Sequence, residues 1–461
     1  MDKMKRTNWK SLIAADVKSQ ILPAWKNPLT SFKDHRIVAP LNLQHEFQAI
    51  ERNNRITGFR RSRLDYIAHL ILSHMKKDLN YFSTLRMDYM RNVVPQAGDY
   101  MDVLIRNGLV DRRGYSTGRN SQLYKFKGTV RLGFRMLTDQ DLCRRKEKVY
   151  EALRKRNSKK YPYLNKWIRQ VKIDRNGAMS QVMRSFNAST EPINKAEIKK
   201  THRIGQIERI ASGDLYIKYS QTERRLHTNV TNLASELLPY IHIDGNSFVE
   251  IDIRNSQPFF VISLFNPTPE IEQLIDDYLG EGLTSYIRSL EAIEREDVQK
   301  YISLVTSGKF YEYMAEVFRE NGIPVTDRKE VKVEIFRTCF FGSRNTYKFK
   351  DGEYDSARVF KKTFPTIFRL FYRIKEQDTN RLAVLLQRIE SYTMLERVVS
   401  RFEAELPGLP ILTRHDSLLI PKSGLLGNGK NLDKALDIFT TGVQDTTGVL
   451  PQGRMTKLRP K

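Results

Sequence analysis

Two short apolar runs, far apart in the chain, each carry an aspartate. The first run, residues 249–257, is β-branched and apolar and contains Asp252. The second run, residues 411–420, is apolar on both sides of a polar centre formed by His415 and Asp416. Runs of this composition and length are typical of buried strands. The pattern therefore predicts a buried strand that holds Asp252, and a β-hairpin with His415 and Asp416 near its tip.

A different pattern, in residues 61–143, predicts a small α+β region. Residues 64–72 and 100–105 have the helical spacing of apolar positions, and residues 107–115 and 121–126 are typical of two short strands around a glycine-rich turn. Helices followed by a basic β-hairpin are similar to a winged helix, a module that binds nucleic acids. The alternative is a small unit that only packs against the rest of the chain.

The remainder of the chain is expected to form one larger unit that is rich in helix. Helical patterns fill residues 270–320, 355–375 and 379–405, between the strand-like runs that carry the aspartates. We therefore expect a mixed α/β (α+β) protein. Its expected parts are an N-terminal extension (1–60), the small α+β unit (61–143), a basic helical linker (144–200) and the main unit (201–461).

The charge balance of the chain indicates a class of binding partner. The 461 residues include 78 Lys and Arg against 53 Asp and Glu, a net charge of +25. Neutralising phosphate groups releases condensed counterions, so a strongly basic protein is expected to bind nucleic acid. Ribosomal, heparin-binding and membrane-surface proteins share this balance. Residues 144–160 hold nine basic and two acidic side chains, which fits a helix along a phosphate backbone or a solvated linker; the C-terminal residues 454–461 are expected to form a basic tail.

Cysteine content and hydropathy bear on two further questions: whether the chain is a disulfide or zinc protein, and whether it is secreted or membrane-bound. Cys143 and Cys339 are the two cysteines, and their separation supports neither a disulfide framework nor a zinc cluster. The chain begins without an apolar signal segment, and no run of about 18 apolar residues follows. We therefore expect a cytoplasmic protein without a membrane partner.

A third element, between the two aspartates, indicates the chemistry. Carboxylates on neighbouring strands can hold a pair of divalent metal ions, the minimal apparatus for in-line phosphoryl transfer, although a lone strand aspartate is more often structural. Arg328 and Lys332 are four residues apart, so they share a helix face on which they can bind a triphosphate. Phe340, Phe341 and Gly342 follow about two turns later.

The order and approximate spacing of these three elements, over residues 200–450, resemble family A DNA polymerases and the single-subunit RNA polymerases of phages and mitochondria. The resemblance implies a right-hand polymerase with a palm sheet, mostly helical fingers and thumb, and residues 144–200 as linker or thumb. It implies that Asp252, Asp416 and the backbone carbonyl of Ile253 bind two Mg²⁺ ions. It also implies that Arg328 and Lys332 bind the nucleotide, and that Lys332 acts as a catalytic residue on the leaving pyrophosphate.

Further residues gain a role from the same resemblance. The nucleotide would lie beside an aromatic side chain and a glycine of the fingers helix, and near the side chain five residues after Asp252: Phe340 or Phe341, Gly342 and Gln257. Three side chains would contact the template or product: Arg225, His415 and Gln387. The chain departs from the family in that its glycine follows Phe340 only after one extra residue, and phenylalanine stands where the family has tyrosine. No exonuclease domain is recognisable upstream.

The choice between RNA and DNA as product depends on a few positions. Family A DNA polymerases have glutamate where this chain has Gln257 and Ser417, and the form His415-Asp416-Ser417 is that of the single-subunit RNA polymerases. Against RNA, the tyrosine hydroxyl that senses the ribose 2′-OH is missing, and Gln257 is bulky enough to exclude that group. The sequence favours a DNA-directed RNA polymerase, with a family A-like DNA polymerase without proofreading as the alternative.

The expected partners are a nucleic-acid template and product and nucleoside triphosphates. A compact enzyme of this kind fits a phage or mobile element, where it would work in the host cytoplasm with an accessory subunit or a single-stranded-DNA-binding protein. Two other classes stay open. One is a non-catalytic DNA-binding replication or transcription factor built on the winged helix. The other is a metal-dependent nuclease, which would leave Arg328 and Lys332 without a role.

Overall fold

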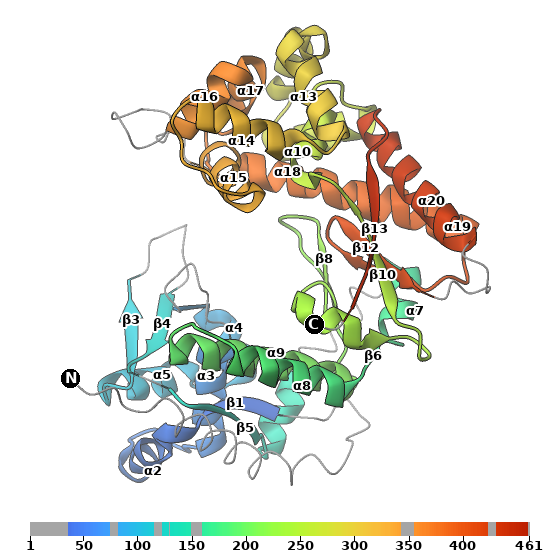
Figure 1. Cartoon of the computed structure of the whole chain (residues 1–461). Coiled ribbons are helices and arrows are strands. Elements are labelled where there is room, and N and C mark those ends of the chain that lie inside the picture. The colour runs from blue at the N-terminus through green and yellow to red at the C-terminus, as the bar shows by residue number, and fades with distance from the viewer. Residues whose placement is uncertain are drawn as a thin grey trace.

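The computed structural model describes residues 36–73, 82–114, 122–128, 130–148, 159–342, 355–422 and 430–459. Within these ranges the chain is a mixed α/β protein in which helices outnumber strands and the strands form small antiparallel sheets, as expected from the sequence. Figure 1 shows an N-terminal body and a larger body that contains the four-stranded sheet and most of the helices. None of the described helices is long and apolar enough to cross a bilayer.

The N-terminal body has its own hydrophobic core, formed by side chains between Ile37 and Cys143. The two predicted strands pair antiparallel, with Val110 opposite Phe126, and a third strand completes the sheet order β2-β4-β3. Their turn, and most of the basic run 144–160, lie outside the described residues. The elements are β1 (Arg36–Pro40), α2 (Gln44–Asn53), α3 (Arg61–Ser73), β2 (Ser83–Leu85), α4 (Met87–Val93), α5 (Ala97–Arg106), β3 (Val110–Arg113), β4 (Gln122–Phe126) and β5 (Leu132–Met136).

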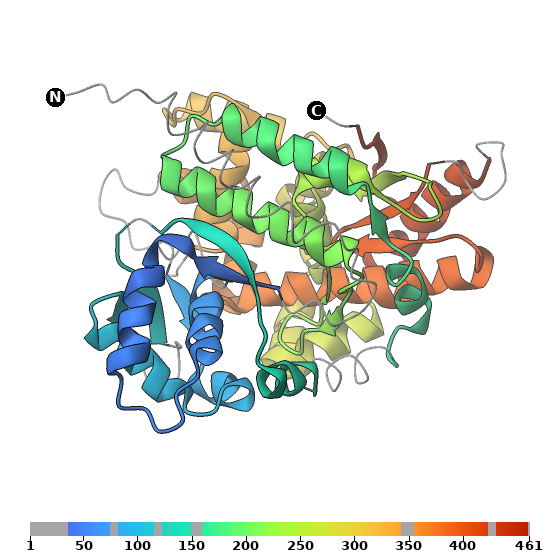
Figure 2. The ribbon, with the colours of Figure 1, turned by 90° about the horizontal axis from the view of Figure 1, so that it is seen from below.

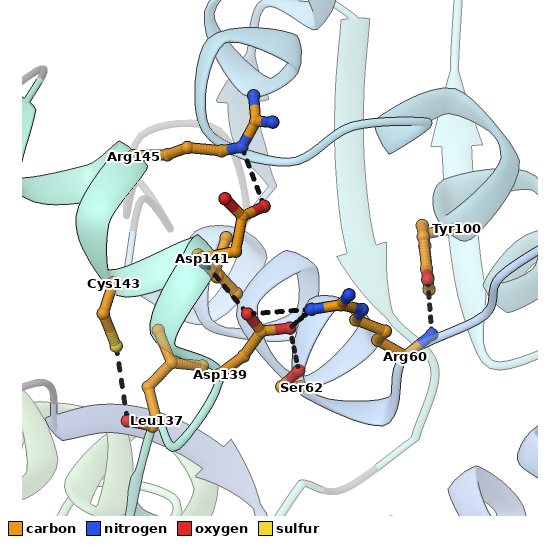
Figure 3. Close-up of polar contacts among 9 residues, drawn as sticks. Arg60, Ser62, Tyr100, Leu137, Asp139, Asp141, Cys143 and Arg145 are labelled. Atoms are coloured by element: carbon orange, nitrogen blue, oxygen red, sulfur yellow. Dashed lines mark hydrogen bonds and ion pairs between the residues drawn. The ribbon is translucent and has the colours of Figure 1, made fainter.

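Asp139 ties two helices of this body together, as Figure 3 shows. Its carboxylate accepts the backbone N–H of Leu142 at 3.0 Å, and so caps the helix of residues 140–148. The same carboxylate accepts the Ser62 hydroxyl at 3.0 Å and pairs with Arg60 at 3.3 Å, at the start of α3. Burial opposes the charge, but these hydrogen bonds keep the pKa of Asp139 below its usual value. The carboxylate is therefore ionised where it joins the two helices.

The larger body is built around a second core that begins at Tyr161 and ends at Val443. Two of its helices, α8 (Arg175–Asn187) and α9 (Ile193–Ala211), pack side by side (Figure 2). α9 also contacts β5, and its Ile198 packs against the first core while Ile204 belongs to the second. One helix therefore contributes to both cores and joins the two bodies.

Most of the larger body is helical, and helices occupy the three segments for which they were predicted. The order of the remaining elements is α7 (Pro162–Ile168), β6 (Lys172–Ile173), β7 (Ile217–Tyr219), β8 (Leu226–Thr228), β9 (Ile241–His242), β10 (Phe248–Ile253), α10 (Ser256–Phe260), α11 (Pro269–Leu279), α12 (Gly282–Ser289), α13 (Glu296–Thr306), α14 (Phe310–Glu320), α15 (Arg328–Ile335), α16 (Asp355–Thr363), α17 (Pro365–Ile374), α18 (Arg381–Tyr392), α19 (Val399–Glu405), β11 (Leu412–Arg414), β12 (Ser417–Pro421), α20 (Lys430–Thr447) and β13 (Gly453–Lys457). π-helical turns follow α15 (Phe336–Phe340) and α18 (Thr393–Val398).

The largest described sheet has the strand order β11-β12-β10-β13. β10 and β12 carry the two apolar runs of the sequence and pair antiparallel, with Val249 opposite Ile420. The last strand, β13, forms where a basic tail was expected, and pairs with the other edge of β10. This sheet brings the two aspartate-bearing runs together, although they are distant in the sequence.

Candidate active site

A row of polar side chains crosses one face of the four-stranded sheet. Asp252 on β10 lies opposite Ser417 on β12 and opposite Arg454 on β13. Ser417 in turn lies opposite Arg414 on β11. Because directly opposed residues of antiparallel strands project from the same face, these four side chains form one row. The intervening residues of β10, such as Ile251, are buried and anchor the strand in the core.

Both carboxylates that β10 presents on this face are paired with arginine. Arg454 binds Asp252 through two parallel hydrogen bonds, of which the one from Nε to Oδ1 is 3.0 Å long. Glu250, two residues earlier, accepts from Arg414 Nη1 and from the Ser417 hydroxyl, each at 2.7 Å. The bidentate pair of Arg454 with Asp252 fixes the plane of that carboxylate, whereas Glu250 is held through its Oε1 alone. The two acidic groups are thus held in place by the neighbouring strands.

The predicted hairpin is confirmed: β11 and β12 are joined by His415 and Asp416 alone. His415 has a φ of +56°, the left-handed conformation that the first position of a two-residue hairpin loop requires. The turn projects Asp416 beyond the sheet, where its carboxylate accepts the Ser256 hydroxyl. His415 lies edge-on to His227, with 5.8 Å between ring centroids. Burial, aided by nearby Arg225, lowers the pKa of His415 to about 4, so the ring is neutral at pH 7.

The turn between β10 and α10 connects the sheet to the helical part of the site. Asn255 has a φ of +57°, a conformation that asparagine tolerates better than most residues. Its side-chain oxygen accepts a hydrogen bond of 2.7 Å from Arg328 Nη2. The next residue, Ser256, donates to Asp416. One turn therefore contacts both of the other sequence elements, the hairpin tip and α15.

Arg328 and Lys332 lie one turn apart on α15, as their spacing predicts. Asp327 caps the helix by accepting the backbone N–H of Glu330 at 2.8 Å, so Arg328 is the first helical residue. Arg328 also pairs with Glu312 at 3.0 Å, whereas Lys332 is exposed. Arg328 therefore lies beside the turn that follows Asp252, and Lys332 lies one helical turn further along α15.

The aromatic residues after α15 lie in a π-helical turn, in which the backbone N–H of Phe341 bonds to the carbonyl of Phe336 at 2.8 Å. Such a turn contains one residue more than an α-helical turn. Phe340 is fully buried and contacts Phe371, with 5.2 Å between centroids. Phe341 is 42% exposed and stacks on Phe336. The extra residue noted in the sequence is accommodated here, and Phe341 is the phenylalanine that a ligand can reach.

The end of this turn depends on a glycine and a buried lysine. A Cβ atom on Gly342 would lie 2.4 Å from the carbonyl oxygen of Thr338, so the close approach that requires glycine is to the chain's own backbone. Lys375 donates to the carbonyls of Cys339 at 2.5 Å and Gly342 at 3.0 Å. Burial lowers the pKa of Lys375 to about 8, so its ammonium group persists at pH 7. These contacts fix the backbone position of Phe341.

A buried carboxylate from α18 completes the site. Glu390 is 1% exposed; its Oε1 accepts from Arg225 Nη2 at 2.5 Å and its Oε2 from Gln257 Nε2 at 2.9 Å. Burial raises the pKa of Glu390 to about 7, with Arg225 opposing the rise and Asp416 adding to it. Arg225 and Gln257 were expected to contact nucleic acid and nucleotide, and the structure joins them through this residue.

Several buried polar atoms of the site have no hydrogen-bond partner within the described part of the chain. They are Nε of Arg225, Nδ2 of Asn255, Oε1 of Gln257, Nε of Arg414 and Nδ1 of His415. A buried polar atom without a partner costs about 1–3 kcal/mol, and folded proteins contain few of them. These five atoms lie at the turn after β10, in the hairpin and just before β8, and a bound water molecule or a polar ligand could satisfy them.

For two further expected site residues, the structure shows the position but no contact that bears on their role. Ile253 is the last residue of β10; it is buried and lies opposite Gly453 of β13. Gln387 is half-buried on α18, one turn before Glu390. Both belong to elements that form the site.

Sequence reasoning missed Glu390, Arg454 and Asn255. Glu390 stands in an ordinary helical pattern, and Arg454 in what reads as a basic tail. Only Asn255 carried a local signal, because asparagine directly after a strand often adopts the left-handed conformation.

A magnesium ion is the cofactor that the carboxylates of the site would hold. Among the described residues, no group of three or more histidine, cysteine, aspartate or glutamate side chains surrounds one point. Mg²⁺ is commonly bound through one or two carboxylates and completes its coordination with water and substrate phosphates. The two candidate carboxylates are Asp252, on β10, and Asp416, in the turn just before Ser417, which lies opposite Asp252. To bind the ion, Asp252 would exchange the guanidinium of Arg454 for it.

Neither a protein-family model nor a curated protein matches the chain. Among solved structures, the chain is similar to the POL domain of Pol1 from M. smegmatis, in complex with DNA primer-template and dNTP. The TM-score is 0.39 at 11% sequence identity, and the match covers 60% of this chain and 55% of that chain. The chain thus spans about half of the structure that it matches. The likeness is distant.

Proposed function

We propose that the chain catalyses template-directed nucleotidyl transfer and joins ribonucleotides on a DNA template. The observation that carries the proposal is the turn after β10. Asn255 accepts from Arg328, Ser256 donates to Asp416, and Gln257 donates to Glu390. Three sequence elements with the residue types of a nucleotidyl transferase therefore meet at one turn, next to Asp252.

Each group of site residues has its own role in the proposed reaction. Arg328 and Lys332 bind the triphosphate from one helix face, and Lys332 stabilises the leaving pyrophosphate. Phe341 packs against the nucleotide and is itself stacked on Phe336, which also contacts the buried Phe340. Asp252 and Asp416 would hold two Mg²⁺ ions, with the carbonyl of Ile253 as a further oxygen ligand; the ions would supply activation of the primer 3′-hydroxyl and charge stabilisation on the phosphates. His415, neutral at pH 7, contacts the nucleic acid by hydrogen bonding, without adding charge.

The net positive charge of the chain favours binding of the nucleic-acid template. A net charge of +25 raises the local concentration of a nucleic-acid template and of Mg²⁺-nucleotide complexes near the site. Arg225, just before β8, and Gln387, on α18, would contact the template or product.

Primer extension tests this function. The full chain, a labelled primer on a single-stranded DNA template and Mg²⁺ should give extension with NTPs at a rate at least about tenfold above that with dNTPs. Preference for dNTPs would instead support a family A-like DNA polymerase. Degradation of the labelled strand without nucleotides would support a nuclease, and duplex binding without either activity would support a DNA-binding factor.

We also propose that the N-terminal body binds duplex nucleic acid through its β-hairpin. The order α3-β2-α4-α5-β3-β4, with β2 paired to β4, is the connectivity of winged helices. The helix that would enter a groove, α5, exposes Asp99 and Asp102, which repel phosphate. The hairpin instead carries basic side chains: Arg112 and Arg113 on β3, Lys125 on β4 and Lys127 just after β4. The guanidinium of Arg113 lies 4.4 Å from the ring centre of Phe82.

Removing the exposed Arg113 should therefore weaken duplex binding without regard to sequence. We expect Arg113→Ala to lower affinity several-fold and to reduce the slope of log K against log salt concentration by about one, measured by fluorescence anisotropy. Arg106→Ala on α5 is the matched control and should leave the slope unchanged. A larger effect of Arg106→Ala than of Arg113→Ala would assign binding to α5.

A further inference from the structure

Glu390 is an unusual group to find in the interior of a helical body. Its carboxylate joins three elements, because α18 carries it, the segment before β8 carries Arg225, and α10 carries Gln257. Burying a carboxylate is costly, and a buried ion pair is often no more stabilising than apolar residues of similar size. The position of Glu390 is therefore better explained by what it orients than by what it adds to stability.

The orientation that it imposes follows from hydrogen-bond chemistry. Both oxygens of the Glu390 side chain accept hydrogen bonds, Oε1 from Arg225 and Oε2 from Gln257, whereas a glutamine amide has a donating nitrogen and an accepting oxygen. Gln257 must therefore turn its nitrogen toward Glu390, as the 2.9 Å contact shows. Its oxygen then points the other way, and this buried atom meets no donor among the described residues. Glu390 thus orients Gln257 so that the Gln257 oxygen is a free hydrogen-bond acceptor within the described part of the chain. This acceptor lies at the turn that also contacts Asp416 and Arg328.

We propose that Glu390 is a positioning residue for sugar selection, which holds the Gln257 carbonyl oxygen as the acceptor for the 2′-hydroxyl of an incoming ribonucleotide. The inference rests on the proposed function and names its substrate class. A ribose offers the donor that this buried acceptor lacks, whereas a deoxyribose leaves it unpaired. Sites that hydrogen-bond a hydroxyl discriminate strongly against the analogue without it, for this reason. Selection here works by attraction, and not by excluding the larger sugar.

The test compares NTP and dNTP incorporation by the full chain and three variants. Glu390→Gln keeps the volume of the side chain, but the new amide can donate as well as accept, so it no longer dictates the orientation of Gln257. Gln257→Leu removes the acceptor and keeps the size. Glu208→Gln is the matched control, since Glu208 also forms a buried pair with an arginine, Arg175 at 2.8 Å, between α9 and α8 and outside the site.

We expect the ratio of kcat/KM for NTP to that for dNTP to fall at least tenfold in both site variants. The fall should come from NTP incorporation, with kcat/KM for dNTP changed less than about threefold. Glu208→Gln should keep the wild-type ratio. An unchanged ratio in a folded Glu390→Gln protein, or an equal loss with both substrates, overturns the proposal and leaves nucleotidyl transfer standing. If Glu390→Gln does not fold, Gln257→Leu decides by the same criterion.

Calorimetric titration separates this inference from the proposed function. Mg²⁺ with GTP and Mg²⁺ with dGTP are titrated into the wild type and the same variants, without primer or template. Should the wild type incorporate no nucleotide, the proposed polymerase fails. Tenfold tighter binding of GTP than of dGTP, lost in Glu390→Gln, would still support the role of Glu390. Equal binding of the two nucleotides, or binding of neither, would overturn it.

Discussion

Replacing Asp252 or Asp416 by asparagine should reduce nucleotide incorporation at least about 10³-fold. Asparagine keeps the size and one oxygen of the side chain but removes the charge that a pair of Mg²⁺ ions requires. The effect should appear in kcat, measured by single-nucleotide extension under saturating nucleotide. Affinity for primer-template should change less than about threefold, because the basic surfaces that bind phosphate are untouched.

The control for these variants is Asp445→Asn. Asp445 also pairs with an arginine, Arg401 at 2.7 Å, but lies on α20, outside the site. It should retain the extension rate of the wild type. Near wild-type extension by Asp252→Asn would show that the sheet does not carry the chemistry. The proposed metal site would then have to be abandoned.

Alanine at Arg328 or Lys332 should lower kcat/KM for the nucleotide by about two orders of magnitude. In the structure Arg328 holds Asn255 through a 2.7 Å hydrogen bond, and in the proposed reaction it would also bind the nucleotide. We therefore expect Arg328→Ala to affect both KM and kcat. Lys332 makes no such contact with the turn, so Lys332→Ala should lower kcat, through loss of charge beside the leaving pyrophosphate.

Lys329 provides the matched control for these two positions. It is exposed and directly follows Arg328, but lies about 100° around the helix axis from it. Lys329→Ala removes the same charge from the same helix and should keep kcat/KM within about threefold of the wild type. Equal losses in Lys329→Ala and Lys332→Ala would mean that α15 contributes only general positive charge.

The parts of the site that the sequence predicted are those with a local signal. A β-branched run marks β10, and apolar runs around a two-residue polar centre mark the hairpin with Asp416. The face shared by Arg328 and Lys332 follows from helical spacing alone. The mixed α/β class follows because segments with the helical spacing of apolar positions alternate with strand-like runs. In these segments, local preference and tertiary structure agree.

The rest could not be predicted because it depends on contacts between distant residues or on a change of helix type. The partners of Glu390 are 165 and 133 residues away, and nothing in the pattern of α18 distinguishes this glutamate from a surface one. Counting eight residues from Lys332 selects Phe340, which is buried. The π-helical turn places the next residue, Phe341, at the surface. The pattern of polar and apolar residues does not reveal a change from α-helical to π-helical hydrogen bonding.

The pair between Arg454 and Asp252 bears on how the protein reaches its native state. Many small metal-binding domains remain unfolded until the ion arrives, because their acidic or thiolate ligands repel one another or stay unpaired without it. Here β13 supplies the opposite charge from within the chain, directly across from Asp252. The central sheet can therefore assemble with its acidic residue already neutralised. We expect the chain to fold without a divalent cation, so the protein treated with a chelator should still show a thermal unfolding transition, even where catalysis stops.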